Sequence, residues 1–247
     1  QNTPMFDLLA DYTDPLTVGN YDTNSWLPAA ASLVRGSNML KYYGTFGGVS
    51  LGLSHSFGEQ AGGSRLGSQN GASLQYTVGN LSLGAGAQQT ISTVNSDYKN
   101  NAYNLSATYQ AGPAKLFAGF FRIKDATGTT NYYIGANNSL AANNGGVVGQ
   151  TRSDKGYFLG TTVQLNPAWT LTGAGYYDRS RNVTVQSVGS FGDGTRYAVV
   201  AVAEYALSKR TQLYGTVDYN RAKEAAAVEL AGRGNVTTGG VGIRHIF

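Results

Sequence analysis

The chain has no cysteine, few charged residues and no long apolar run. Without cysteine it has no disulfide scaffold, no Cys-ligated zinc site and no thiol nucleophile. Its longest apolar stretch, residues 198–203, is far shorter than the roughly 20 residues that a membrane-spanning helix needs. The two histidines, His55 and His245, leave little for a metal site. These absences exclude helical membrane proteins, enzymes with a cysteine nucleophile and proteins with a Cys-ligated zinc site.

Charged residues make up 13% of the 247 residues, about half the roughly 25% of an ordinary soluble domain. The net charge is +4, but no cluster of Lys and Arg marks a nucleic-acid surface. Glycine is abundant at 34 residues, and the 17 tyrosines argue against disorder. The first residues show neither the basic nor the apolar region of a signal peptide. We expect a folded chain with no nucleic-acid partner.

Alternation of apolar and polar residues is the main structural signal. In residues 103–110, Tyr, Leu, Ala and Tyr alternate with Asn, Ser, Thr and Gln, which is the period of a β-strand. Short Gly- or Pro-containing connections alternate with long polar ones, as in an up-and-down antiparallel sheet. About eleven strands are predicted, near residues 37–44, 48–57, 70–79, 81–92, 101–111, 114–125, 155–166, 169–181, 195–207, 211–223 and 236–247.

The length of these strands separates a membrane barrel from a soluble sandwich. They run to about 10–12 residues, close to the 9–11 that a tilted strand needs to cross a bilayer. Tyrosines and Trp169 stand near strand ends on the apolar face, as in the aromatic girdles of such barrels. In lipid a sheet crosses only when it is closed. We therefore predict an all-β, antiparallel, up-and-down transmembrane β-barrel with an apolar outer face and a polar lumen.

Residues 1–36 do not follow this pattern. Met5, Leu8, Leu9 and Tyr12 have helical spacing, and Thr3 and Pro4 suit the start of a helix. The segment is acidic, and Arg35 is its only base. A long acidic loop of this kind is uncommon in a compact domain and usually functional.

Several motifs resemble a known family. They are residues 2–7 (NTPMFD), 38–43 (NMLKYY) followed by 46–48 (FGG), 79–85 (GNLSLGA) with Gln88 and Gln89, 207–211 (LSKRT) followed by Tyr214 and Gly215, and 241–247 (VGIRHIF). In this order they resemble the general porins of β-proteobacterial outer membranes, of the Neisseria, Burkholderia and Comamonas type.

The resemblance implies a sixteen-stranded, water-filled, homotrimeric porin in the outer membrane of a Gram-negative cell. Its third external loop would fold into the lumen, and residues 1–36 match the position of that loop. Phe247 matches the C-terminal aromatic that the outer-membrane assembly machinery is thought to recognise. The implied partners are outer-membrane lipid, ions and small hydrophilic solutes, and no cofactor is implied.

The strand count departs from the family. Eleven strands against sixteen suggest that residues 1–247 are the C-terminal portion of one porin barrel domain. An odd count would also force a parallel closing pair, whereas single-chain bacterial barrels have even counts. Three alternatives stay open: the count is off by one, residues 1–36 contain a further strand, or the barrel closes in parallel.

The pore constriction is the site of interest, because charges at the narrowest point of a pore select ions. Residues 1–36 would supply its acidic side, and inward-facing bases would supply its basic wall. The candidates are Asp7, Asp11, Asp14, Asp22, Arg35, Lys41, Arg122, Lys124, Arg179, Arg221 and Arg244, of which Lys41 is the strongest basic candidate.

The predicted function is passive diffusion of ions and small hydrophilic solutes through an outer-membrane porin. The alternative is a surface-exposed adhesin or binding barrel whose long loops matter and whose lumen is plugged. No partner for His55 as a general base is identifiable by spacing. We therefore expect no enzymatic activity and no cofactor or metal.

Overall fold

A computed structural model describes residues 1–17, 34–61, 63–136, 138–231 and 233–246. The predicted constriction residue Asp22 and the predicted assembly signal Phe247 lie outside the described residues.

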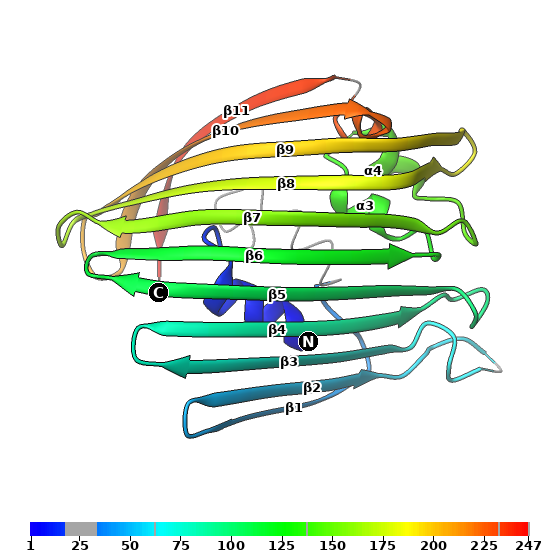
Figure 1. The fold of residues 1–247 in the computed structure, drawn as a ribbon, viewed down its shortest axis with the longest axis horizontal. Helices are drawn as coiled ribbons and strands as arrows, with labels where there is room; N and C mark the ends of the chain where they lie inside the picture. The colour runs from blue at the N-terminus through cyan, green and yellow to red at the C-terminus, as the bar shows by residue number, and fades with distance from the viewer. Residues whose placement is uncertain (18–33, 62, 137, 232, 247) are drawn as a thin grey trace.

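Eleven strands form one antiparallel sheet in chain order, as the alternation predicted (Figure 1). The strands are β1 (Met39–Phe46), β2 (Val49–Ser56), β3 (Gln69–Val78), β4 (Leu81–Ile91), β5 (Lys99–Ala111), β6 (Ala114–Asp125), β7 (Arg152–Gln164), β8 (Trp169–Val185), β9 (Gly189–Ala206), β10 (Thr211–Glu224) and β11 (Asn235–His245). The all-β, up-and-down antiparallel fold class is confirmed.

Tight turns join the strands at one end of the sheet. Gly47, Gly79 and Gly112 have φ values of 54°, 54° and 58° in three of these turns. Glycine adopts this left-handed conformation without steric cost, so these residues set the hairpins.

The opposite end of the sheet carries the long connections. They contain the short helices α3 (Thr130–Ile134), α4 (Leu140–Asn144) and η2 (Ala225–Glu229). No helix in the described part of the chain is long and apolar enough to span a membrane.

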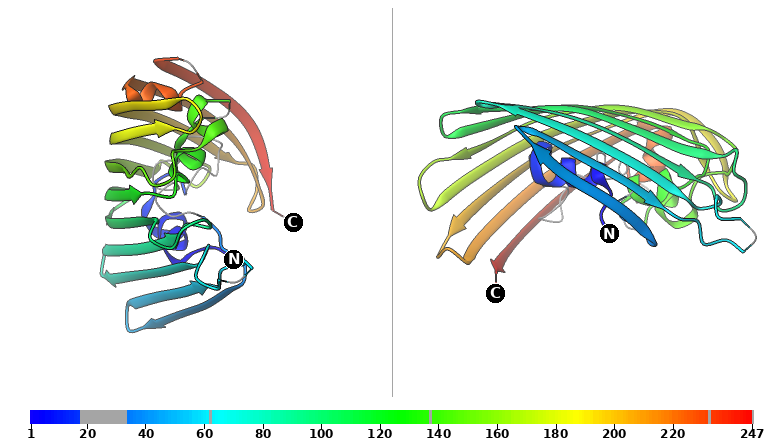
Figure 2. Two further views of the ribbon diagram at one scale, coloured as in Figure 1. Left: turned by 90° about the vertical axis from the view of Figure 1, so that its right-hand side faces the viewer. Right: turned by 90° about the horizontal axis from the view of Figure 1, so that it is seen from below.

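The sheet is curved like a half-pipe and is not closed (Figure 2). Within the described residues β1 pairs with β2 alone and β11 with β10 alone. A parallel closing pair is therefore not formed, and the count of eleven is confirmed. The described part of residues 1–36 contributes an isolated bridge between Asn2 and Arg35 rather than a strand.

The two faces of the sheet differ in composition. The convex face exposes large apolar side chains such as Leu40, Leu159 and Val241, and no second layer of the described chain covers them. The aromatic residues predicted for this face lie on it, except Phe247, which is outside the described residues. They are Tyr42, Tyr103, Tyr109, Tyr157, Trp169, Tyr177, Tyr197 and Tyr205. The concave face carries buried polar rows that include Gln75, Gln88 and Asn104.

The N-terminal segment lies inside the curve of the sheet, against the concave face. It forms α1 (Pro4–Leu8), which continues into the π-helix η1 (Leu9–Thr13). Thr3 caps α1 by accepting a hydrogen bond from the backbone N–H of Phe6 at 3.4 Å, and Pro4 opens the first turn. The expected helix is confirmed.

The concave face is not polar throughout. Met5, Leu9 and Leu16 of the N-terminal segment share a buried cluster with inward side chains of β5–β9, including Phe121 and Phe158. Apolar residues face inward here because the N-terminal segment covers them. The main core of the described structure therefore lies between this segment and the middle of the sheet.

Candidate pore constriction

The ends of the N-terminal segment are held together beside β1. The amino group of Gln1 donates to Gly36 O at 3.0 Å, and the N–H of Thr3 donates to Val34 O at 3.1 Å. Residues 1–3 and 34–36 therefore lie side by side, while α1 and η1 lie inside the curve of the sheet.

Glycines on the concave face let the segment approach the wall closely. A Cβ atom at Gly86 would lie 2.6 Å from Met5 Cγ, and one at Gly160 would lie 2.5 Å from Pro15 Cγ. A Cβ atom at Gly52 would likewise lie 2.9 Å from the Cβ atom of Pro4. Any larger side chain at these positions would displace the segment, so glycine sets its depth in the interior.

Polar contacts fix the other side of the segment to β1. Lys41 Nζ donates to a carboxylate oxygen of Asp7 and, at 3.1 Å, to the carbonyl of Asn2. The hydroxyls of Tyr12 and Tyr43 lie 3.3 Å apart. The hydrogen bond to Tyr43 and partial burial raise the pKa of Tyr12 to about 12.

A cavity of about 440 Å³ lies between the segment and the concave face near the short turns. The segment contributes Asp11 and Asp14, and the strands contribute Lys115, Glu204 and Arg244. Charges of both signs therefore face one water-accessible space across the interior. Low-dielectric walls strengthen the field of such charges on a passing ion.

The two acids of this cavity differ in setting. Asp14 is buried and accepts a hydrogen bond from the Tyr176 hydroxyl at 2.7 Å. Asp11 is exposed to the cavity, and partial burial, followed by the nearby charge of Asp7, raises the pKa of its carboxyl above the usual value, while Lys41 opposes this. Lys115 Nζ donates to Tyr12 O at 3.3 Å, which ties β6 to the segment.

The sequence matches the Gram-negative porin family over residues 1–225. The chain belongs to this family. Membership of the Gram-negative porin family places the protein in the outer membrane. None of the curated proteins compared with this porin matches it.

Solved structures show the same fold. An anion-selective porin from Comamonas acidovorans is 22% identical with a TM-score of 0.63, and the match covers 87% of this porin and 60% of that chain. In vitro folded OmpT of Vibrio cholerae is 15% identical with a TM-score of 0.69, over 99% and 74%. OmpF of Salmonella typhi is 13% identical with a TM-score of 0.59, over 86% and 63%. This porin therefore spans 60% of the length of the Comamonas protein.

The structure brings five of the predicted constriction residues to the concave side. Asp7 pairs with Lys41, while Asp11, Asp14 and Arg244 line the cavity. Arg35 is exposed and lies instead at a smaller cavity of about 280 Å³ with Glu59 and Tyr133, near the long connections. Its Nε donates to Asn2 Oδ1 at 3.3 Å.

The inward orientation predicted for Arg122, Lys124, Arg179 and Arg221 is wrong. Arg122 pairs in register with the exposed Tyr103 and with Lys155, and Lys155 pairs with Arg179. All four residues belong to the convex face.

The cause is clearest in β6, which is apolar on both sides. Leu116 and Phe120 point outward, whereas Phe117 and Phe121 point inward. Because Phe121 and Ile123 are buried inside the curve, the intervening Arg122 must point outward. Alternation of hydrophobicity alone could not assign the faces of this strand.

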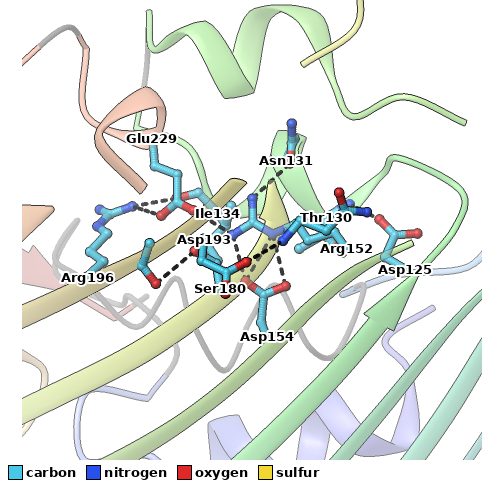
Figure 3. Close-up of polar contacts among 12 residues, drawn as sticks. Asp125, Thr130, Asn131, Ile134, Arg152, Asp154, Ser180, Asp193, Arg196 and Glu229 are labelled. Atoms are coloured by element: carbon cyan, nitrogen blue, oxygen red, sulfur yellow. Dashed lines mark hydrogen bonds and ion pairs between the residues drawn. The ribbon is translucent and has the colours of Figure 1, made fainter. Parts of the chain in front are cut away.

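A buried ionic cluster also lies on the concave side, near the long connections (Figure 3). Arg152 donates to both oxygens of Asp154 at 2.7–3.0 Å and to Glu229 Oε1 at 2.5 Å. Arg196 donates to Glu229 Oε2 at 3.5 Å and to Ile134 O at 2.7 Å. The cluster fastens α3 and η2 to the sheet.

The sequence analysis missed this cluster and two residues of the cavity, Lys115 and Glu204, as site residues. Arg152 and Asp154 were assigned to a loop, although their spacing of two residues is that of one strand face. Arg196 has the same parity as Glu204 and the opposite parity to Tyr197 on β9, and this spacing does indicate its inward direction.

Proposed function

We propose that the protein is a water-filled channel for passive diffusion of ions and small hydrophilic solutes, with residues 1–36 as its constriction loop. The observation that supports this most strongly is the charged cavity between that segment and the concave wall. Asp11 and Asp14 lie on the segment side of this cavity, and Lys115, Glu204 and Arg244 lie on the wall side. The ion pair of Asp7 and Lys41 holds the segment against β1 beside it. A solute would pass between the segment side and the wall side.

The complete channel requires a closed wall, because backbone N–H and C=O groups are not left unpaired in lipid. We propose that β1 and β11 pair with further strands to give a sixteen-stranded barrel. We also propose a homotrimer, a state that the Vibrio cholerae OmpT structure shows for that protein. Recognition of Phe247 by the outer-membrane assembly machinery belongs to the same proposal.

No catalytic step is part of this proposal. The described residues hold no group of three or more His, Cys, Asp or Glu that could bind a metal ion. His55 bonds to Asn70 at 2.8 Å and His245 to Thr211 at 2.8 Å, both away from the cavity.

Single-channel recording in planar bilayers tests the proposal on the full-length protein. We expect stepwise ohmic conductance that rises with salt concentration. A folded protein that gives no steps would overturn it and would favour a plugged binding barrel. Deletion of residues of α4 is a separate test of the two classes. A binding barrel should lose its ligand after this deletion, whereas a channel should keep its conductance steps.

A further inference from the structure

Six basic residues form a patch on the convex face of β6, β7, β8 and β10. They are Arg122, Lys124, Lys155, Arg179, Arg181 and Lys223, and we call them the cation patch. Arg122, Lys155 and Arg179 pair in one row across three strands. Lys124 and Arg181 flank Ser153 in the next row toward the long connections.

An aromatic row lies directly beside the cation patch, on the side of the short turns. Phe120, Tyr157, Tyr177 and Tyr197 pair in register across β6–β9, and Arg221 of β10 continues the row beside Tyr197. The rings of Phe120 and Tyr157 are 5.3 Å apart. On β6, β7 and β8 the cation stands two residues from its aromatic neighbour, for example Arg122 after Phe120, and therefore on the same face.

Almost no negative charge balances this patch within the described structure. Asp193 lies 3.9 Å from Arg181 Nε, and both side chains are exposed. Asp125, Asp154 and Asp178 of the same strands are buried on the concave side, and the exposed Glu224 ends β10 next to Lys223. Arg122 Nε has no hydrogen-bond partner. The patch thus gathers six of the 18 basic residues of the chain on one face.

The position of the patch indicates what it meets. Aromatic rows mark the boundary between hydrocarbon and headgroups, and long loops lie on the external side of such barrels. A row of cations one step beyond the aromatic row is therefore at the headgroup level of the outer leaflet. Guanidinium and ammonium groups bind phosphate through charge-assisted hydrogen bonds.

We propose that the cation patch binds the phosphate groups of a phosphorylated lipid in the outer leaflet. The proposal rests on the outer-membrane location of the family and not on whether the barrel conducts. The lipid chains would lie along the apolar convex face below the aromatic row. Its phosphates would lie over Arg122, Lys155 and Arg179.

Binding of diphosphoryl lipid A to the full-length protein in neutral detergent tests this proposal. We compare the wild type with the triple variant R122Q/K155Q/R179Q. A cation near an anionic surface changes affinity about fivefold, so we expect a loss on the order of a hundredfold. The matched control is K209Q/R210Q, which removes charge at the opposite end of the barrel and should bind as the wild type does.

Two further measurements separate this occupant from others. Lipid A without its phosphates should bind the wild type as weakly as diphosphoryl lipid A binds the triple variant, and millimolar inorganic phosphate alone should not displace the lipid. Equal affinity of wild type and triple variant for diphosphoryl lipid A, with both proteins folded by circular dichroism, would overturn the proposal. So would a triple variant that loses its oligomeric state and keeps its lipid, because the patch would then face a second copy of the chain.

Discussion

Lys41 on the concave face of the edge strand β1 donates a hydrogen bond to Asp7 of α1, 34 positions earlier in the chain. Both side chains are largely buried, with 18% and 22% of their surface exposed. The pair joins the N-terminal segment to the wall and places opposite charges at the proposed constriction. Changing either residue should therefore alter ion selectivity.

Replacing Lys41 with methionine removes one positive charge from the constriction and leaves Asp7 without its partner. Because surface potentials in narrow polar sites reach several kT, we expect the cation-to-anion permeability ratio to rise roughly twofold. The reversal potential in a salt gradient measures this ratio. Asp7→Asn should shift the ratio the opposite way, and Lys209→Met, at a short turn, should leave it unchanged. A K41M channel with wild-type selectivity would remove Lys41 from the constriction.

Gly86 determines how closely α1 approaches β4. A valine there would place its Cβ 2.6 Å from Met5 Cγ, so the helix must move. Overpacking of this kind costs typically about 1–3 kcal/mol of unfolding free energy. Gly173→Val is the matched control, because a Cβ there meets nothing within 4 Å on the convex face. Urea unfolding of both variants measures the difference, and equal stabilities would contradict the close packing of α1.

The sequence predicted the strands well because their alternation extends over many residues and their turns contain glycine. Each of the eleven predicted ranges overlaps one strand, and Thr3 and Pro4 correctly indicated the start of α1. The predicted ranges for β7, β8 and β9 were too short at the end toward the long connections. These signals are local, since each depends on neighbouring residues in one segment.

The orientation of several charged residues could not be predicted, because it depends on segments that fold back over the sheet. Arg122 lies between Phe121 and Ile123, which are buried under distant parts of the chain. The partners Arg152 and Glu229 are 77 positions apart, and no local pattern joins them. Inward and outward faces are therefore ambiguous wherever a strand is apolar on both sides.

Arg152 should be essential for holding α3 and η2 against the sheet. Replacing it with methionine leaves Asp154 and Glu229 as buried carboxylates without their main cation. Breaking a buried pair in this way costs about 3–5 kcal/mol. The midpoint of urea unfolding should fall accordingly. Arg181→Met removes an exposed arginine 3.9 Å from Asp193 and should change the midpoint little. Equal midpoints for the two variants would show that the cluster does not stabilise the fold.

Asp11 should make the selectivity of the channel depend on pH. Its pKa is raised above the usual value, first by burial and then by the charge of Asp7, so it binds a proton at a higher pH than an ordinary aspartate does. As the pH falls through this raised pKa, the cavity loses a negative charge and the cation preference should decrease.

Reversal potentials measured from neutral to acidic pH follow this loss of charge. Asp11→Asn should show the low-pH selectivity already at neutral pH, whereas Asp97→Asn, in the connection between β4 and β5, should follow the wild-type curve. The raised pKa of Asp11 also makes the free energy of unfolding depend on pH. Because the folded state binds the proton more tightly, the contribution of Asp11 to stability is present at low pH and is lost as the pH rises through the folded-state pKa. An Asp11→Asn channel whose selectivity still follows the wild-type pH curve would show that another group titrates at the constriction.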